Sequence, residues 1–271
     1  MTGTPEKLSA APEAGPEIET SCDRFLNGRC AVLQPRKGRH RSGHDAILLA
    51  ATVPADARGR VVDLGAGVGV AGLALAVRVP ALAVTLAERD PVAVALAQRS
   101  LALPENAAVR GRVRVVEADV TAPAAVRQAA GLGRETAEHV ILNPPFYPAG
   151  SVRSATAERA AAHVLAEDGL ERWLRTAADL LVAGGRVHLI FPASGLKTAL
   201  DALDGRFGAL RIRPVQARLG GDAIRVLVGG VKGSRAPLGL GAPLVLHEAS
   251  GAGPSAEAAA ILAGDAGIDL G

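Results

Sequence analysis

The sequence predicts an α/β fold in which helices cover both faces of a doubly wound, mostly parallel sheet. From about Gly59 onward, short runs rich in valine and leucine alternate with alanine-rich segments of helical length, as in successive strand–helix–strand units. Near the end, a Gly-Gly-Asp link joins two strand-like runs and leaves no room for a helix, which indicates an antiparallel hairpin. We therefore expect seven strands, the first five parallel and the final pair reversed.

Periodicity and capping residues place the individual elements. Asp90 as N-cap and Pro91 at the first helical position open the second helix, and Thr121 is expected to cap the third. Gly184 and Gly185 are expected to end the fourth. Strands are expected at residues 60–64, 82–88, 112–119, 139–146, 185–191, 209–217 and 223–233. Helices are expected at residues 70–79, 90–103, 121–133, 169–185 and 195–203, with a short helical piece at 256–262.

Composition excludes a largely disordered or highly charged chain. The 271 residues carry a net charge of +3, 49% are hydrophobic and only 2% are aromatic, so the core must consist of alanine, valine and leucine. Two cysteines, Cys22 and Cys30, are too few for a disulfide framework or a zinc site. They favour a reduced, cytoplasmic setting with no bound metal.

No segment has the character of a signal peptide or a membrane span. The first 20 residues, rich in Pro, Gly, Glu and Ala, lack an apolar core and predict a disordered tail. The apolar run 61–87 is interrupted by Asp63, Arg78 and Pro80, which favours buried strands and a helix over a transmembrane segment.

A glycine-rich turn and two acids predict a nucleotide-like ligand. Residues 63–69, Asp-Leu-Gly-Ala-Gly-Val-Gly, lie between a strand and a helix, where glycines allow close approach of a ligand and Asp63 favours a cationic head group. Glu88 ends the second strand and can accept both hydroxyls of a ribose, although it can equally be an exposed partner of Arg89. Asp119 can accept an adenine amine or cap the next helix.

The most specific motif is Asn143-Pro144-Pro145-Phe146, at the carboxyl end of the fourth strand. Successive prolines fix the chain, so carbonyl oxygens and the Asn143 amide oxygen can converge on a planar amino group. Accepting its two N–H bonds favours the pyramidal form that attacks a methyl sulfonium. Phe146, with Tyr147 after it, offers a face for stacking a base.

Two basic regions predict contact with a polyanion. The first contains Arg36, Lys37, Arg39, His40 and Arg41, which form either a solvated loop or a phosphate-binding patch. The second makes the C-terminal third basic through arginines that alternate along strands, and it consists of Lys232, Arg235, Arg211, Arg213, Arg218 and Arg225. Trp173, on an apolar helical stripe, is expected in the core.

Together these motifs resemble the class I AdoMet-dependent amino methyltransferases with an N/D-P-P-Y/F motif. Residues 40–51 and the segments near Leu238 and Gly251 are similar to the bacterial tRNA1(Val) adenine-N6 methyltransferases, which more often have Thr at the position of His44. The resemblance, from about Phe25 to His247, implies a Rossmann-like seven-stranded sheet with a reversed last strand. It also implies an AdoMet site formed by Asp63, Gly65, Ala66, Gly67, Gly69, Glu88, Arg89, Asp119 and Asn143.

The expected organisation is a tail (1–21), a basic extension that caps substrate and cofactor (22–58), a methyltransferase domain (59–249) and a C-terminal tail with a short helix (250–271). The expected activity is methylation of the exocyclic N6 amine of an adenine in tRNA, next to the anticodon. Methylation of a guanine N2 amine in rRNA or of a protein glutamine amide remains open. Alternatives from other classes are a non-catalytic AdoMet- or RNA-binding module and, on the glycine-rich turn alone, a nicotinamide dehydrogenase.

Overall fold

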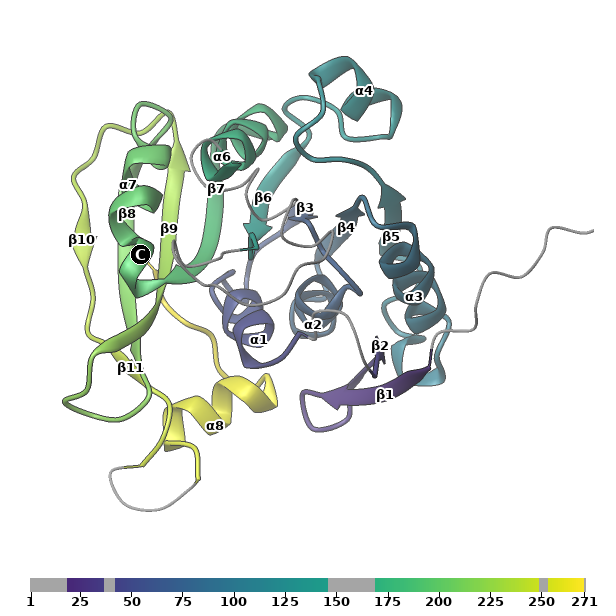
Figure 1. Ribbon diagram of the computed structural model, residues 1–271, viewed down its shortest axis with the longest axis horizontal. Coiled ribbons are helices and arrows are strands. Elements are labelled where there is room, and N and C mark those ends of the chain that lie inside the picture. The colour runs from purple at the N-terminus through teal and green to yellow at the C-terminus, as the bar shows by residue number, and fades with distance from the viewer. Residues whose placement is uncertain (1–18, 37–41, 146–168, 249–252, 271) are drawn as a thin grey trace, which may run out of the picture.

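The computed structural model describes residues 19–36, 42–145, 169–248 and 253–270. Its main sheet has the strand order β10-β8-β9-β7-β6-β3-β4-β5, and β11 also pairs with β8 (Figure 1). The long strands are β3 (Gly59–Leu64), β4 (Leu82–Glu88), β5 (Val113–Glu117), β6 (Ala137–Leu142), β7 (Leu181–Pro192), β8 (Phe207–Gln216) and β9 (Ala223–Lys232). The two-residue strands β10 (Gly239–Leu240) and β11 (Leu244–Val245) extend the edge. The predicted doubly wound α/β sheet is confirmed.

The hairpin at the end of the chain is present, but only one of its strands is reversed. β9 pairs antiparallel with both β7 and β8, because it inserts between them. β8 therefore runs in the same direction as the first five strands, which corrects the expectation of a reversed pair. The last long strand alone is reversed.

Helices cover both faces of the sheet (Figure 1). One face packs against α1 (His44–Ala51), α2 (Val70–Arg78), α3 (Pro91–Leu101) and α8 (Ala256–Ala263), and the other against α6 (Gly169–Leu180) and α7 (Leu196–Leu203). The shorter elements are α4 (Ala124–Ala129) and the 3-10 turns η1 (Pro104–Asn106) and η2 (Ala193–Gly195). Both cores are mostly aliphatic, as the composition predicts, with Trp173, Phe191 and Phe207 in the core on the α6 side. None of the helices in the described ranges is long and apolar enough to cross a membrane.

Two predicted helix boundaries are wrong. The helix expected to reach Gly185 ends at Leu180, where the N–H groups of Glu135 and Thr136 bind the carbonyls of Asp179 and Leu180 at 2.9 and 2.8 Å. These contacts satisfy terminal carbonyls and let the chain enter β7 directly, with a register shift against β6. At α4, Pro123 occupies the N-cap position in place of Thr121.

The N-terminal extension contains a β-hairpin formed by β1 (Thr20–Phe25) and β2 (Cys30–Pro35). β1 includes Thr20 and Ser21, the last two residues of the predicted tail. Asn106 of η1 binds both backbone groups of Ala31 through its side-chain amide, at 3.2 and 2.6 Å. The Asn106 side chain thus makes the hydrogen bonds that a neighbouring strand would make to Ala31, and it holds the hairpin beside α3. Within β2, burial raises the pKa of the Cys30 thiol to about 12, which keeps it protonated.

Candidate functional site

The glycine-rich turn joins β3 to α2 and has one open side. Gly65, Gly67 and Gly69 all adopt positive φ angles, +65°, +55° and +90°. A Cβ added to Gly69 would lie 2.7 Å from Leu86, whereas one added to Gly67 would meet nothing within 4 Å. The N–H of Ala66 donates to the carbonyl of Ala87 at 3.0 Å and holds the turn against β4. The turn is therefore rigid on its inner side and open at Gly67, as a ligand cradle requires.

Asp63 is buried beneath this turn, and its carboxylate faces α2. Its Oδ2 accepts a hydrogen bond from the N–H of Gly72 at 2.9 Å, and the residue is only 3% exposed. Gly69, the N-cap of α2, has no side chain with which to satisfy the first-turn donors, so Asp63 does this from the strand. Burial, with a smaller contribution from the charge of Glu88, raises the pKa of Asp63 to about 7 against the opposing effect of Gly72.

Glu88 binds three backbone N–H groups at the end of β4. Its Oε2 accepts from Gly67 at 2.9 Å, and its Oε1 accepts from Arg89 and Asp90, both at 2.8 Å. The alternative of a side-chain partner in Arg89 is not observed: that contact is to the backbone, and the Arg89 residue is exposed. A carboxylate offers about four acceptor positions, so one is left while the contact to Gly67 persists. Binding both hydroxyls of a ribose would require exchange of that contact.

Asp119 follows β5 and forms a local turn. Its Oδ1 accepts hydrogen bonds from both the N–H and the hydroxyl of Thr121, at 2.8 and 2.7 Å. Because Pro123 is the N-cap of α4, the alternative role of Asp119 as an N-cap is replaced by this turn. The residue is exposed. Since Glu88 pairs with Glu117 across β4 and β5, Asp119 lies two residues beyond that pair, at the same edge of the sheet.

Asn143 and Pro144 begin directly after β6, next to the glycine-rich turn. Leu142 pairs with Leu64, so Asn143 and Gly65 leave neighbouring strands at the same level. Asn143 is half-buried and Pro144 buried, and within the described ranges no hydrogen bond engages the Asn143 side-chain amide. Pro145 is exposed. The predicted contributions of Phe146 and Tyr147 lie outside the described residues.

Trp173 of α6 forms the wall behind Gly65. A Cβ added to Gly65 would lie 2.2 Å from Cη2 of the indole, and the tryptophan is 8% exposed. The predicted core position is confirmed. Its contact with the turn was not predicted, because a single tryptophan on an apolar stripe carries no sign of which loop it will touch.

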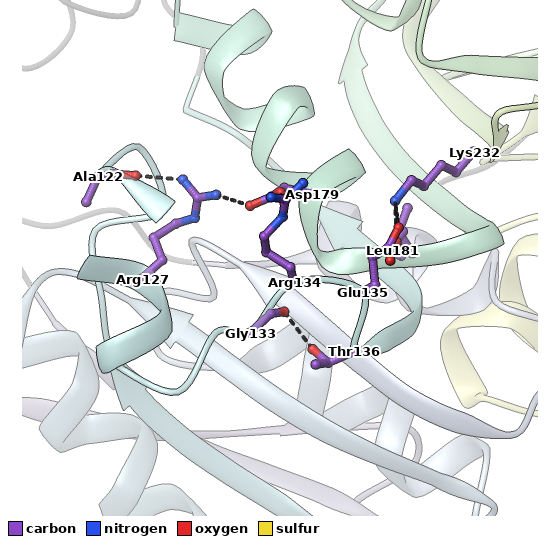
Figure 2. Close-up of polar contacts among 9 residues, drawn as sticks. All are labelled: Ala122, Arg127, Gly133, Arg134, Glu135, Thr136, Asp179, Leu181 and Lys232. Carbon is purple, nitrogen blue, oxygen red and sulfur yellow. Dashed lines mark hydrogen bonds and ion pairs between the residues drawn. The ribbon is translucent and has the colours of Figure 1, made fainter. Parts of the chain in front are cut away.

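The structure does not bring Lys232 and Arg235 to this edge of the sheet. Because β9 is antiparallel, its end lies where the parallel strands begin. There the Lys232 ammonium donates to the carbonyl of Leu181 at 2.6 Å and to Glu135 at 3.1 Å (Figure 2). Arg235 follows beyond this end and is exposed.

Some of the remaining basic residues contact other parts of the protein, and others lie outside the described residues. Arg36 donates through Nε to the carbonyl of Thr20 at 3.0 Å and is exposed, while Lys37, Arg39, His40 and Arg41 lie outside the described residues. Arg213 pairs with Glu257 of α8 at 2.5 Å, and Arg225 pairs with Asp45 of α1 at 2.9 Å. These two arginines share a face, as the alternation predicts, and tie helices to the sheet.

A hollow of about 620 Å³ opens at the opposite edge of the sheet, where the parallel strands begin. Thr52, His139 and His188 form part of its lining. Thr52 donates its hydroxyl proton to the carbonyl of Leu49 at 2.7 Å, so its oxygen must accept from His188 Nδ1, 3.1 Å away. His188 Nε2 then accepts from His139 Nδ1 at 3.1 Å. Burial lowers the pKa of His139 to about 4 and that of His188 well below its ordinary value.

In the described part of the chain, no three His, Cys, Asp or Glu side chains cluster as a metal site.

A sequence profile of the methyltransferase small domain family matches residues 42–213. The chain belongs to this family. The predicted AdoMet-dependent methyltransferase activity is thereby confirmed. The residues at this edge have chemistry that suits the cofactor: the turn is open at Gly67, and Glu88 and Asp119 offer carboxylate oxygens that can accept from hydroxyl and amine donors.

Curated relatives cover part of the chain. The tRNA1(Val) (adenine(37)-N6)-methyltransferase of Porphyromonas gingivalis is 30% identical over 183 residues, 66% of this chain and 67% of the relative. The ribosomal RNA small subunit methyltransferase C of Pasteurella multocida is 31% identical over 169 residues, 60% of this chain and 40% of the relative.

Solved structures of methyltransferases share the fold. A predicted O-methyltransferase from Agrobacterium tumefaciens is 40% identical, with a TM-score of 0.72, over 83% of this chain and 98% of its own. The TYW2 protein of M. jannaschii, in complex with AdoMet, has a TM-score of 0.53 at 14% identity, covering 80% of this chain and 88% of its own. The second likeness concerns the fold alone.

Proposed function

We propose that this methyltransferase transfers a methyl group to the exocyclic N6 amine of an adenine in tRNA. The observation that carries the proposal is the position of Asn143 and Pro144, which leave β6 beside the turn between β3 and α2. This position brings an acceptor of amine N–H bonds next to the cofactor cradle. The likeness to the P. gingivalis enzyme supports adenine in tRNA as the acceptor.

The cofactor is held by the residues at the carboxyl edge of β3, β4 and β5. The Gly67 side of the turn receives the methionine part, Glu88 the ribose hydroxyls and Asp119 the adenine amine. Asp63 acts indirectly, because its carboxylate binds the N–H of Gly72 and fixes the start of α2. AdoMet supplies an electrophilic methyl group on its sulfonium.

The chain's contribution to the chemical step is to orient the amine. The amide oxygen of Asn143 and the carbonyl of Pro144 accept the two amine N–H bonds, which withdraws the nitrogen lone pair from conjugation with the ring and directs it at the methyl carbon. The N–C bond forms as the S–C bond breaks, and the methylated nitrogen then releases one proton to water. No protein base is needed before transfer, because a neutral amine is itself the nucleophile.

A guanine N2 amine in rRNA is a second candidate, because an exocyclic amine of guanine suits the same acceptor pair. The 31% identity to the P. multocida rRNA enzyme supports it. A hydroxyl acceptor, as in the name of the A. tumefaciens protein, fits less well, since Asn143 and Pro144 offer no group that takes a hydroxyl proton.

The test is to incubate the purified protein with labelled AdoMet and total RNA from cells that lack this gene, and to identify labelled nucleosides by mass spectrometry. We expect N6-methyladenosine in the tRNA fraction. Labelled N2-methylguanosine in rRNA would replace the proposal with the second candidate, and a label on ribose oxygen would refute amine methylation. Absence of label from RNA would direct the search to protein amides.

A further inference from the structure

We propose that this protein has a separate binding site for a phosphate-class anion, centred on Arg60 and Arg114. The two arginines line one hollow of about 300 Å³ on the face of the sheet that carries α6, over β3, β4 and β5. This hollow is distinct from the AdoMet cradle, and its chemistry is the same whichever base is methylated.

Two hydrogen bonds hold the Arg114 guanidinium in place, and its third nitrogen, Nη1, remains available to a ligand. Its Nε donates to Thr85 Oγ1 at 2.8 Å, and its Nη2 donates to the carbonyl of Gly131 at 2.9 Å. A Cβ added to Gly131, which has a φ of +90°, would lie 3.3 Å from Nη1. The guanidinium is therefore oriented before any ligand arrives, and Nη1 has no hydrogen-bond partner within the described ranges. A fixed guanidinium loses little entropy when it binds oxygen ligands.

Thr85 adds a buried donor beside the exposed Arg114. It is 7% exposed, and its oxygen accepts from Arg114, so its hydroxyl proton is free to point elsewhere. Across the described residues, no acceptor for this proton is found. Thr85 pairs with Arg114 on β5 and with Val62 on β3, which places the hydroxyl in the row of side chains that faces the hollow.

Arg60 supplies a second positive charge. It precedes Val62 by two residues and therefore lies on the same face. Glu138 accepts from the backbone N–H of Arg60 at 2.5 Å, but among the described residues the Arg60 guanidinium forms no ion pair or hydrogen bond. Two like charges in one hollow repel each other, and an anion between them removes that cost.

The other side chains around the hollow neither neutralise the arginines nor compete for an anion. Its remaining lining residues are Val62, Gln128, Gly131, Leu132, Gly133 and Thr136, none of them acidic. The Thr136 hydroxyl donates to the carbonyl of Gly133 at 2.8 Å (Figure 2). The nearby carboxylate of Asp179 pairs with Arg127 and Arg134, both at 2.6 Å (Figure 2).

Donors without acceptors define the ligand chemistry. Two guanidinium groups and a hydroxyl match the several oxygens and the double charge of a phosphate, and Arg is well suited to that geometry. A volume of about 300 Å³ admits one phosphate with part of its ester group. The phosphate can belong to an RNA backbone or to a small molecule, and the two sources are separable by experiment.

The experiment is a calorimetric titration of the full chain with inorganic phosphate at constant ionic strength, on wild type, Arg60→Gln, Thr85→Val and Arg60→Gln/Arg114→Gln. Arg99→Gln, an exposed arginine of α3 on the other face, is the control for loss of one charge. We expect the phosphate Kd to rise at least about tenfold in Arg60→Gln, severalfold in Thr85→Val, and not in Arg99→Gln. AdoMet binding, measured on every variant, verifies the fold.

A second arm measures tRNA affinity against salt concentration. If the ligand is an RNA phosphate, the double variant should lower the salt slope by about one to two units relative to Arg99→Gln. An unchanged slope together with lost phosphate binding assigns the site to a small phosphate compound. Phosphate binding that survives in Arg60→Gln and in the double variant, or that Arg99→Gln weakens equally, overturns the proposal.

Discussion

The carboxylate of Asp63 accepts a hydrogen bond from the N–H of Gly72, 2.9 Å away, and so links the end of β3 to the first turn of α2. This contact joins the two elements that flank the glycine-rich turn. The turn at Gly67 can therefore stay open to a ligand without loss of its shape, because its two ends are joined below it.

Replacement of Asp63 by Asn should reduce the pH dependence of stability. Burial raises the pKa of Asp63 from 3.8 to about 7, so the folded state holds a proton that the unfolded state has released. This contribution is complete below about pH 4 and is lost as the pH rises to 7, at about 1.4 kcal/mol per pH unit at most. The unfolding midpoint of Asp63→Asn minus that of wild type, without AdoMet, should increase between pH 5 and pH 8. An equal difference at both pH values would contradict the assignment.

Gly65→Ala should weaken AdoMet binding much more than Gly67→Ala does. Both positions have positive φ, so the backbone strain is similar, but only at Gly65 would the new Cβ meet Trp173, at 2.2 Å. We expect a difference of about 1–2 kcal/mol between the two variants, measured by calorimetry. Trp173→Phe should restore part of the loss in Gly65→Ala. Independent, additive effects of the two changes would show that the indole does not hold the turn.

The sequence predicted the elements that obey local rules and missed contacts between distant segments. The strand ending at Glu88 and the helix opened by Asp90 and Pro91 are found as expected, since side-chain pattern and capping determine them. The Trp173 contact with Gly65 joins residues more than 100 positions apart, and no periodicity encodes such a pairing. The same holds for Asp63: the sequence shows an acid before the glycine-rich turn, but the packing of α2 on β3 determines that its partner is Gly72.

Local sequence also leaves open those segments whose residues suit two structures. Leu180 and Leu181 fit an apolar helix as well as a buried strand, and the backbone contacts from Glu135 and Thr136 decide between them. The charge of Lys232 predicts a contact with substrate but does not predict where in the fold the residue lies. The direction of β9 decides where it lies, and direction follows from strand order, which local sequence does not reveal.

His139→Asn should flatten the acid side of the stability profile. Burial and the charge of Arg186 lower the pKa of His139 from 6.5 to about 4, so the folded state excludes a proton that the unfolded state binds. The resulting stability is present above pH 6.5 and is lost as the pH falls toward 4, the opposite sign to Asp63. Asn keeps a donor for His188 Nε2. In chemical denaturation at pH 7 and pH 5, the variant should lose less stability on acidification than wild type, and an equal loss would show that folding does not lower the pKa of His139.

Removal of the basic segment should weaken RNA binding, whereas removal of Lys232 should not. Replacing Arg36, Lys37, Arg39 and Arg41 by Ala is expected to lower tRNA affinity and its salt dependence, because fewer counterions are released on binding. Lys232→Met serves as the matched control, because its ammonium binds Leu181 and Glu135 at the opposite edge. It should cost about 1 kcal/mol of stability and leave the salt slope unchanged. An unchanged slope in the fourfold variant would identify the segment as a solvated loop.

Asn143→Ala should abolish methyl transfer while AdoMet still binds. The Asn143 amide is half-buried and makes no hydrogen bond within the described ranges, so its loss leaves no partner unsatisfied in the folded protein. The proposed mechanism needs its oxygen only when the amine is presented, which predicts a loss of at least about 100-fold in kcat with an AdoMet Kd within about threefold. Asn143→Asp keeps an acceptor oxygen and should retain more activity than the alanine variant. If AdoMet affinity falls in parallel with transfer in Asn143→Ala, then the residue holds cofactor, and the separation between cradle and acceptor site is wrong.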